Sequence, residues 1–151
     1  MEYKHVRQIV NNIKHHISGL HITGSVKRKS AIINDIDFIT LKKLDIVMKK
    51  LKELYPHNLV LKEGDKHSSI SLDIDDKYVQ VDIWKAENKY GLFYQKFNRD
   101  MTKGQNIGYK KMAKNKGLLL SDDGLYDENS NLINITNVNE LKTFLKSLLL
   151  L

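Results

Sequence analysis

The stretch from Gly24 to Phe38 constrains the fold of this chain more than any other part of the sequence. It reads GSVKRKSAIINDIDF, which is a glycine turn, a short basic segment and then a strand with two carboxylates one residue apart. Successive side chains of a strand point to opposite faces, so Asp35 and Asp37 share one face and Ile36 and Phe38 share the other. The apolar face suits packing on a hydrophobic core, and the carboxylates then lie on the opposite face.

The paired carboxylates indicate a site for a divalent cation. Two like charges held side by side repel each other unless a cation lies between them. Magnesium prefers oxygen ligands and is held by carboxylates together with substrate phosphates. Gly24 and Ser25 offer backbone N–H groups and a hydroxyl, and residues 27–29 are basic, so the segment can hold a triphosphate beside the metal. The plainer interpretation is a surface turn followed by an ordinary edge strand.

The spacing in this stretch resembles the signature of the nucleotidyltransferase superfamily. Arg28 stands three residues after Ser25 of the Gly-Ser pair, and Asp-x-Asp begins at Asp35, ten residues after Ser25. In that superfamily a third carboxylate, on a neighbouring strand, completes a cluster with the first two. Asp82 is the preferred candidate because it lies in the middle of a predicted strand, on the polar face with Gln80 and Trp84. Asp73 is the alternative, although its strand ends in an ordinary polar turn.

Hydrophobic periodicity predicts an α+β protein. Helical spacing of apolar residues predicts helices over 2–17 and 41–55, and Pro56, the only proline, closes the second. Alternating patterns predict strands over 20–23, 58–61, 69–74 and 78–84, with a turn at 75–77.

The pattern changes after Tyr90. A helical stretch is predicted up to Gly117, followed by a small sheet from residues 118–120, 124–126 and 132–135. A last helix, capped by Thr136 or Asn137, carries its apolar residues on one side: Val138, Leu141, Phe144, Leu145 and Leu148. The closing residues 147–151 are too few for a membrane anchor and are expected to end this amphipathic helix.

The second half of the chain resembles the C-terminal lobe of family X DNA polymerases. In that family a helix with an asparagine and a basic residue runs to a glycine, and a small sheet with a Gly-Leu-Phe/Tyr turn follows. Here these are Asn106, Lys110, Gly117 and residues 124–126. The chain resembles most the very small viral members, which have only two parts. The resemblance implies a catalytic palm over 1–88, a mixed or antiparallel sheet with two helices on one face. A nucleotide-binding and DNA-gripping lobe of helices and β-structure would follow over 89–151.

The resemblance also implies roles for individual residues. Asp35, Asp37 and Asp82 would be the catalytic residues and the ligands of two Mg²⁺ ions, with Mn²⁺ as an alternative metal. The residues expected to bind the nucleotide are Gly24, Ser25, Arg28, Asn34, Tyr94 and Asn106. The residues expected to bind DNA are Lys110, Lys111 and Lys114, for which a lysine-rich solvated helix is the plainer interpretation.

The match to family X is incomplete at two places. Residues 91–94 resemble the start of the hinge before a Tyr-Phe-Thr-Gly stretch that lies under the sugar, but Gln95 and Lys96 follow instead. The residue that distinguishes deoxyribose from ribose is therefore not identified. A basic residue often precedes the third carboxylate by two positions, and Gln80 stands there in this chain.

Composition limits the partners and the chemistry. The formal net charge is +7, which favours an anionic partner, with nucleic acid as the first candidate and an acidic membrane surface as the second. The chain has no cysteine, so disulfides and cysteine-ligated zinc are excluded. His15, His16 and His21 do not make a convincing metal site, because the first two diverge on a helix. No membrane-spanning run or targeting signal is found, we expect a monomer, and a cytoplasmic or virion location stays open.

The function expected from these observations is a small DNA-directed DNA polymerase. It would add deoxynucleotides from deoxynucleoside triphosphates to a primer 3′-hydroxyl on a primer-template or gapped duplex, in gap-filling DNA repair. One alternative is a template-independent nucleotidyltransferase that acts on RNA, protein or a small molecule. A second alternative is a nucleic-acid-binding module without catalysis, although all three carboxylates are present.

Overall fold

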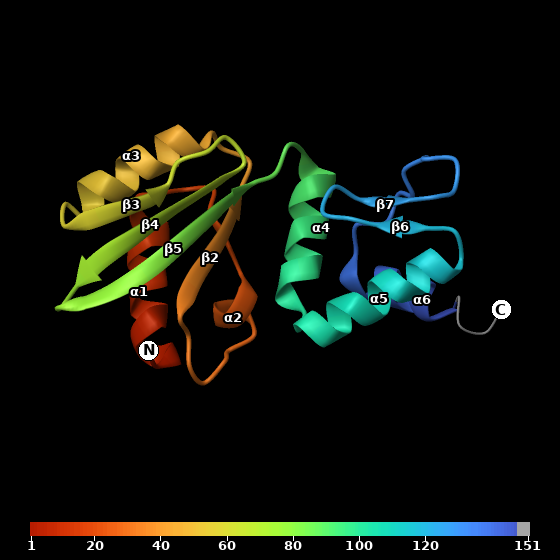
Figure 1. The fold of residues 1–151 in the computed structure, drawn as a ribbon, viewed down its shortest axis with the longest axis horizontal. Helices are drawn as coiled ribbons and strands as arrows, with labels where there is room; N and C mark the ends of the chain where they lie inside the picture. Colours follow the sequence, from red (N-terminus) through yellow and green to blue (C-terminus); the bar gives the residue numbers. More distant parts are fainter. Residues whose placement is uncertain (148–151) are drawn as a thin grey trace. The chain divides into compact units, whose positions relative to one another are not determined.

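The computed structural model describes residues 1–147, and the chain forms two units with their boundary between Glu87 and Asn88. The sequence places this boundary one residue later. Figure 1 labels the helices and, apart from β1, the strands of both units. The N-terminal unit contains the carboxylates, and its sheet decides where they lie.

Residues 1–87 contain a five-stranded mixed sheet with the strand order β1-β2-β5-β4-β3. Strands β2 and β5 are parallel, and the other neighbouring pairs are antiparallel. This order places β2 directly beside β5, although two strands and a helix separate them along the chain. The strands are β1 (His21–Thr23), β2 (Asp35–Thr40), β3 (Asn58–Lys62), β4 (His67–Ile74) and β5 (Lys77–Lys85).

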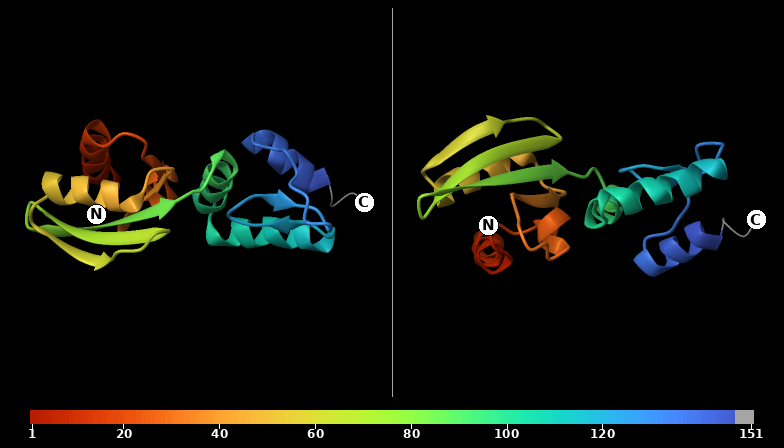
Figure 2. Two further views of the ribbon diagram at one scale, coloured as in Figure 1. Left: turned by 90° about the horizontal axis from the view of Figure 1, so that it is seen from above. Right: turned by 60° about the horizontal axis from the view of Figure 1, so that its bottom comes forward.

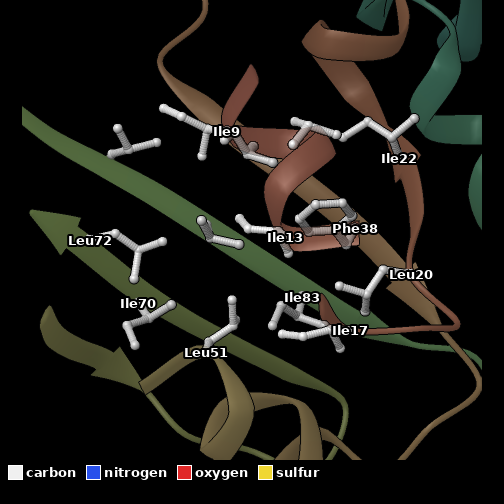
Figure 3. Close-up of a cluster of buried hydrophobic side chains, with 14 of the residues drawn as sticks. Ile9, Ile13, Ile17, Leu20, Ile22, Phe38, Leu51, Ile70, Leu72 and Ile83 are labelled. Atoms are coloured by element: carbon white, nitrogen blue, oxygen red, sulfur yellow. The ribbon is translucent and has the colours of Figure 1, made fainter. Parts of the chain in front are cut away.

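Two helices cover one face of this sheet, as the sequence predicts. They are α1 (Tyr3–His16) and α3 (Leu44–Leu54), and Figure 2 shows both on the same side of the strands. The apolar stripes of the helices pack against the inward residues of the strands (Figure 3). Buried core residues include Ile9, Ile13, Leu51, Ile36, Phe38, Ile70, Leu72, Val81 and Ile83. The single turn α2 (Gly24–Lys27) follows β1 directly.

The C-terminal unit contains, within residues 88–147, the helices α4 (Lys89–Asp100), α5 (Lys103–Asn115) and α6 (Val138–Ser147). The sequence predicts one helical stretch up to Gly117, but the helix breaks at Met101. The break has a local cause, because Thr102 accepts a hydrogen bond from the N–H of Gln105, whose side chain accepts one from the N–H of Thr102. This capping box begins a new helix.

The small sheet is shorter than predicted. Within the described residues, β6 (Leu119–Leu120) pairs with β7 (Leu125–Tyr126), and the third segment contributes a bridge between Tyr126 and Leu132. The cap of α6 is Asn137, whose side-chain oxygen accepts a hydrogen bond from the N–H of Glu140 at 3.0 Å. The residues that the helix buries are Leu141 and Leu145.

Two observations concern the possibility of a membrane anchor. No helix within residues 1–147 is long and apolar enough to cross a membrane. Leu148, and the expectation for the closing residues 148–151, lie outside the described residues.

Candidate active site

The register of the central strand pair brings the three predicted carboxylates onto one face of the sheet. Asp37 lies opposite Asp82, and Asp35 lies opposite Gln80. Neighbouring strands are about 4.8 Å apart, and paired residues in register project to the same side. Because Ile36 and Phe38 point into the core, the carboxylates point to the face that α1 and α3 leave uncovered.

The register also distinguishes Asp82 from Asp73. Asp73 lies on β4, which is separated from β2 by β5, and its partner in the sheet is Tyr78. Tyr78 is four residues before Asp82 along β5. Asp82 is therefore the carboxylate that lies beside the Asp35–Asp37 pair, and Asp73 lies apart from it.

The carboxylate of Asp82 is held by two side chains. Only 7% of the residue is exposed. Oδ1 lies 3.1 Å from Nε2 of His67, and Oδ2 accepts a hydrogen bond of 3.2 Å from the amide of Gln80. The same amide lies 3.3 Å from the hydroxyl of Ser69.

His67 is the residue of this site that sequence reasoning missed. A signal for it was present, because the turn at Asp75 and Asp76 sets the register of the β4–β5 hairpin. Counting back from that turn pairs Ser69 with Asp82 and His67 with Trp84. A hairpin register is local information, since the turn alone specifies it.

The electrostatics of this face suit a cation. Burial raises the pKa of Asp35 above its ordinary value, and the negative charge of Asp82 raises it further. Carboxylate oxygens on one face are the ligands that a hard divalent cation such as Mg²⁺ prefers, so the donor set fits. Within residues 1–147, no three His, Cys, Asp or Glu side chains converge closely enough to hold one ion.

The Gly24-Ser25 turn lies against the strand that carries two of the carboxylates. Gly24 has φ +73°, and a Cβ added to it would stand 2.6 Å from Oδ2 of Asp37. The hydroxyl of Ser25 donates to the backbone oxygen of Asp35 at 3.4 Å. Arg28 and Asn34 are exposed on the segment between α2 and β2. The turn and the carboxylates thus form one continuous part of the N-terminal unit.

Tyr94, which the sequence predicts to bind the nucleotide, lies in the core of the C-terminal unit. Its side chain is completely buried, and its hydroxyl donates a hydrogen bond of 2.8 Å to the backbone oxygen of Ile135. Burial, with smaller contributions from Glu140 and Tyr90, raises the pKa of Tyr94 to about 12. Tyr94 belongs to the buried apolar cluster of the C-terminal unit, which also contains Leu141 and Leu145 of α6.

The remaining predicted residues lie on α5. Asn106 is half-buried, and its amide donates to the side-chain oxygen of Asn98 at 2.8 Å. Asn98 in turn donates to the backbone oxygen of Ser121 at 3.0 Å, so Asn106 is tied through Asn98 to the loop after β6. Lys110, Lys111 and Lys114 are exposed within about one turn of the helix.

The comparisons with known proteins find matches among solved structures. No protein-family model and no curated protein matches the chain. Among solved structures, the chain is similar to a crystal structure of Leishmania infantum polymerase beta in a ternary P/T complex. The TM-score is 0.82 at 15% sequence identity, over 97% of this chain and 73% of that chain. The chain has a polymerase beta-like fold.

This polymerase beta-like fold agrees with the α+β architecture predicted from the sequence. At 15% identity the likeness establishes the fold. The polymerase beta-like fold here carries its three carboxylates on β2 and β5, beside the turn at Gly24.

Proposed function

We propose that the chain is a magnesium-dependent nucleotidyltransferase that works as a small gap-filling DNA polymerase. The observation that carries the proposal is the register between β2 and β5, which sets Asp37 opposite Asp82 with Asp35 on the same face. The neighbouring Gly24-Ser25 turn supports it. Together these features supply metal ligands and phosphate ligands within one small region.

Asp35, Asp37 and Asp82 would hold the divalent ions. Bound magnesium would neutralise the triphosphate and make the attacking hydroxyl easier to deprotonate. The raised pKa of Asp35 is consistent with this assignment: burial is its main cause, and the negative charge of Asp82, which a cation would offset, adds to it.

The residues of the chain itself bind and orient the substrates. Ser25 and the backbone at Gly24 would bind the triphosphate, and the guanidinium of Arg28 would add charge-assisted hydrogen bonds. This positions the α-phosphorus for in-line attack by the primer 3′-oxygen, with pyrophosphate as the leaving group. Asp82 would accept the proton of the 3′-hydroxyl, since it is the buried carboxylate with fixed orientation.

The C-terminal unit would contribute contacts to nucleotide and DNA. Asn106 would contact the incoming nucleotide, supported by the hydrogen bond that fixes its amide on Asn98. Lys110, Lys111 and Lys114 would bind DNA phosphates, supported by their exposure and by the net charge of +7. Membership of family X, likeness to its small viral members and a role in repair rest on the sequence resemblance around residues 106–126.

A template-independent nucleotidyltransferase is the second candidate. The observation that favours it is the sequence after Tyr94, where Gln95 and Lys96 stand in place of the Tyr-Phe-Thr-Gly stretch that lies under the sugar in family X polymerases. Without that stretch, the selection of a deoxynucleotide loses one of its expected contacts with the sugar.

Primer extension on a one-nucleotide gapped duplex tests the proposal. Single deoxynucleotides and magnesium are supplied, and the same primer without a template runs beside it. Extension that follows the template base supports the polymerase. Equal addition without a template supports the second candidate, and absence of addition in both reactions contradicts the proposal.

Two variants locate the activity in that assay. Asp82→Asn should abolish addition because it removes a proposed metal ligand. Asp73→Asn, on the same sheet but away from β2, is the matched control and should extend the primer like the wild-type protein.

A further inference from the structure

We propose that His67 is a positioning residue for Asp82. Its imidazole, held flat against Trp84, fixes the orientation of the Asp82 carboxylate on the face shared by β2 and β5. The inference rests on the proposed function of that face. It concerns a residue that neither the sequence motifs nor the fold comparison identifies.

The first step of the argument is the stack between His67 and Trp84. The two residues are directly opposite each other in the β4–β5 hairpin. Their ring centroids are 3.7 Å apart, and the planes differ by 8°. Cross-strand pairs of flat side chains stabilise each other, and a stacked ring cannot turn about its χ2 angle without losing the contact.

The second step is the contact that this fixed ring makes. Nε2 of His67 lies 3.1 Å from Oδ1 of Asp82, its diagonal neighbour on β5. A carboxylate oxygen only accepts hydrogen bonds, so Nε2 is the donor in this contact. The side chains are 20% and 10% exposed respectively, so water competes little for the bond.

The third step is that two donors hold the two oxygens of Asp82. His67 donates to Oδ1, and the amide of Gln80 donates to Oδ2 at 3.2 Å and, more weakly, to Oδ1 at 3.4 Å. Gln80 stands where family X polymerases often have a basic residue, and its neutral amide is shared with Ser69. Two donors from two strands prevent rotation of the carboxylate about its last bond. Such neighbours orient a ligand before the metal binds, which is the usual function of residues behind a metal ligand.

The location of His67 indicates that it positions Asp82 and does not stabilise the hydrophobic core. His67 and Trp84 lie on the face opposite α1 and α3, outside the buried cluster that holds the N-terminal unit together. Changing His67 should therefore disturb Asp82 more than it disturbs the fold.

Two variants separate the hydrogen bond from the stack. His67→Phe keeps a flat ring for Trp84 and removes the donor, whereas His67→Gln keeps a donor and loses the ring. For each protein, calorimetric titration with magnesium chloride alone gives the metal affinity, and primer extension gives kcat and KM. Urea unfolding, followed by the fluorescence of the only tryptophan, gives the stability of the N-terminal unit.

We expect His67→Phe to weaken magnesium binding and to lower kcat, each by about 10- to 100-fold, with KM for the nucleotide nearly unchanged and stability preserved. His67→Gln should recover part of both losses. Wild-type affinity and kcat in His67→Phe would overturn the inference, as would equal losses in both variants with a matching loss of stability. If the wild-type protein adds no nucleotide but His67→Phe still weakens magnesium binding, the proposed function fails and the positioning role stands.

Discussion

Gly24 and Asp37 lie so close together that a Cβ on residue 24 would stand 2.6 Å from Oδ2 of Asp37. The backbone of Gly24 has φ +73°, a conformation that side chains other than glycine adopt at a cost. The backbone conformation therefore favours glycine here, and a Cβ would also force the Asp37 carboxylate to move. The contact links the proposed phosphate-binding turn to a proposed metal ligand.

We expect Gly24→Ala to lower the free energy of unfolding by about 1–3 kcal/mol, the cost of strained left-handed backbone, and to reduce nucleotide addition because Asp37 must move. Urea unfolding and primer extension measure the two effects. Gly108→Ala is the control, since nothing lies within 4 Å of a Cβ there and the position is inside α5. It should stabilise the protein by about 0.5–1 kcal/mol. Wild-type stability in Gly24→Ala would contradict the predicted backbone strain at residue 24.

Asp35→Asn should increase stability and abolish activity at the same time. Burial and the charge of Asp82 raise the pKa of Asp35, so the ionised form destabilises the metal-free fold. This destabilisation is fully present above the pKa of Asp35 in the folded chain, and it disappears as the pH falls below the pKa of Asp35 in the unfolded chain. Removing the charge should raise the urea midpoint at pH 7 in the presence of a chelator, and primer extension should fall by at least about 10²-fold.

Asp73→Asn is the control for that change, and it should alter neither the urea midpoint nor the activity appreciably. A lower midpoint for Asp35→Asn would show that Asp35 supports the fold through its charge, contrary to this expectation.

Tyr94 should make the C-terminal unit sensitive to alkaline pH. Its pKa is raised to about 12 in the fold, from 10 in its ordinary state. The unfolded chain therefore loses this proton at lower pH than the folded chain. The stability that protonated Tyr94 contributes to the fold is fully present below pH 10 and is lost as the pH rises through about 12. In Tyr94→Phe this part of the pH dependence should be absent. The hydrogen bond to Ile135 is lost as well, which lowers stability at pH 7 by about 1–2 kcal/mol. Circular dichroism during urea unfolding across this pH range measures both effects.

Charge reversal on α5 tests the proposed DNA contacts. Changing Lys110, Lys111 and Lys114 to Glu should weaken binding to a gapped duplex and reduce its salt dependence, by about 0.9 in the slope of log affinity against log salt for each lost phosphate contact. Fluorescence anisotropy at several salt concentrations measures the slope.

The matched control reverses three exposed lysines of the N-terminal unit, at or near α3: Lys43, Lys49 and Lys50. It changes the net charge equally and should change the slope less. Equal slopes for the two triple variants would support a solvated helix in place of a DNA-binding one.

Local patterns predicted much of this molecule because the physics behind them is local. The two-residue period of β2 places Ile36 and Phe38 in the core, and both are fully buried. The helical periods of α1 and α3 mark the faces that they bury. The break between α4 and α5 is also encoded locally, in the capping box of Thr102 and Gln105, although helical periodicity alone predicts one continuous stretch.

Tyr94 shows where local patterns fail. From its position in the helical repeat alone, Tyr94 could equally be a surface residue beside a cleft or a residue of the core. Burial was decided by Ile135, whose backbone oxygen, 41 residues further on, satisfies the hydroxyl that would otherwise need water.

By itself, the sequence determined that Asp35 and Asp37 share a face and that a glycine turn precedes them, because strand alternation and turn chemistry depend on neighbours in the chain. Only the tertiary structure decided that Asp37 lies opposite Asp82. This pairing joins two residues that are 45 positions apart in the sequence and lie on parallel strands. It forms because helices α1 and α3 need one continuous apolar surface to cover. Burial of that surface selects the order and register of the strands, and the register places the three carboxylates on one face of the sheet.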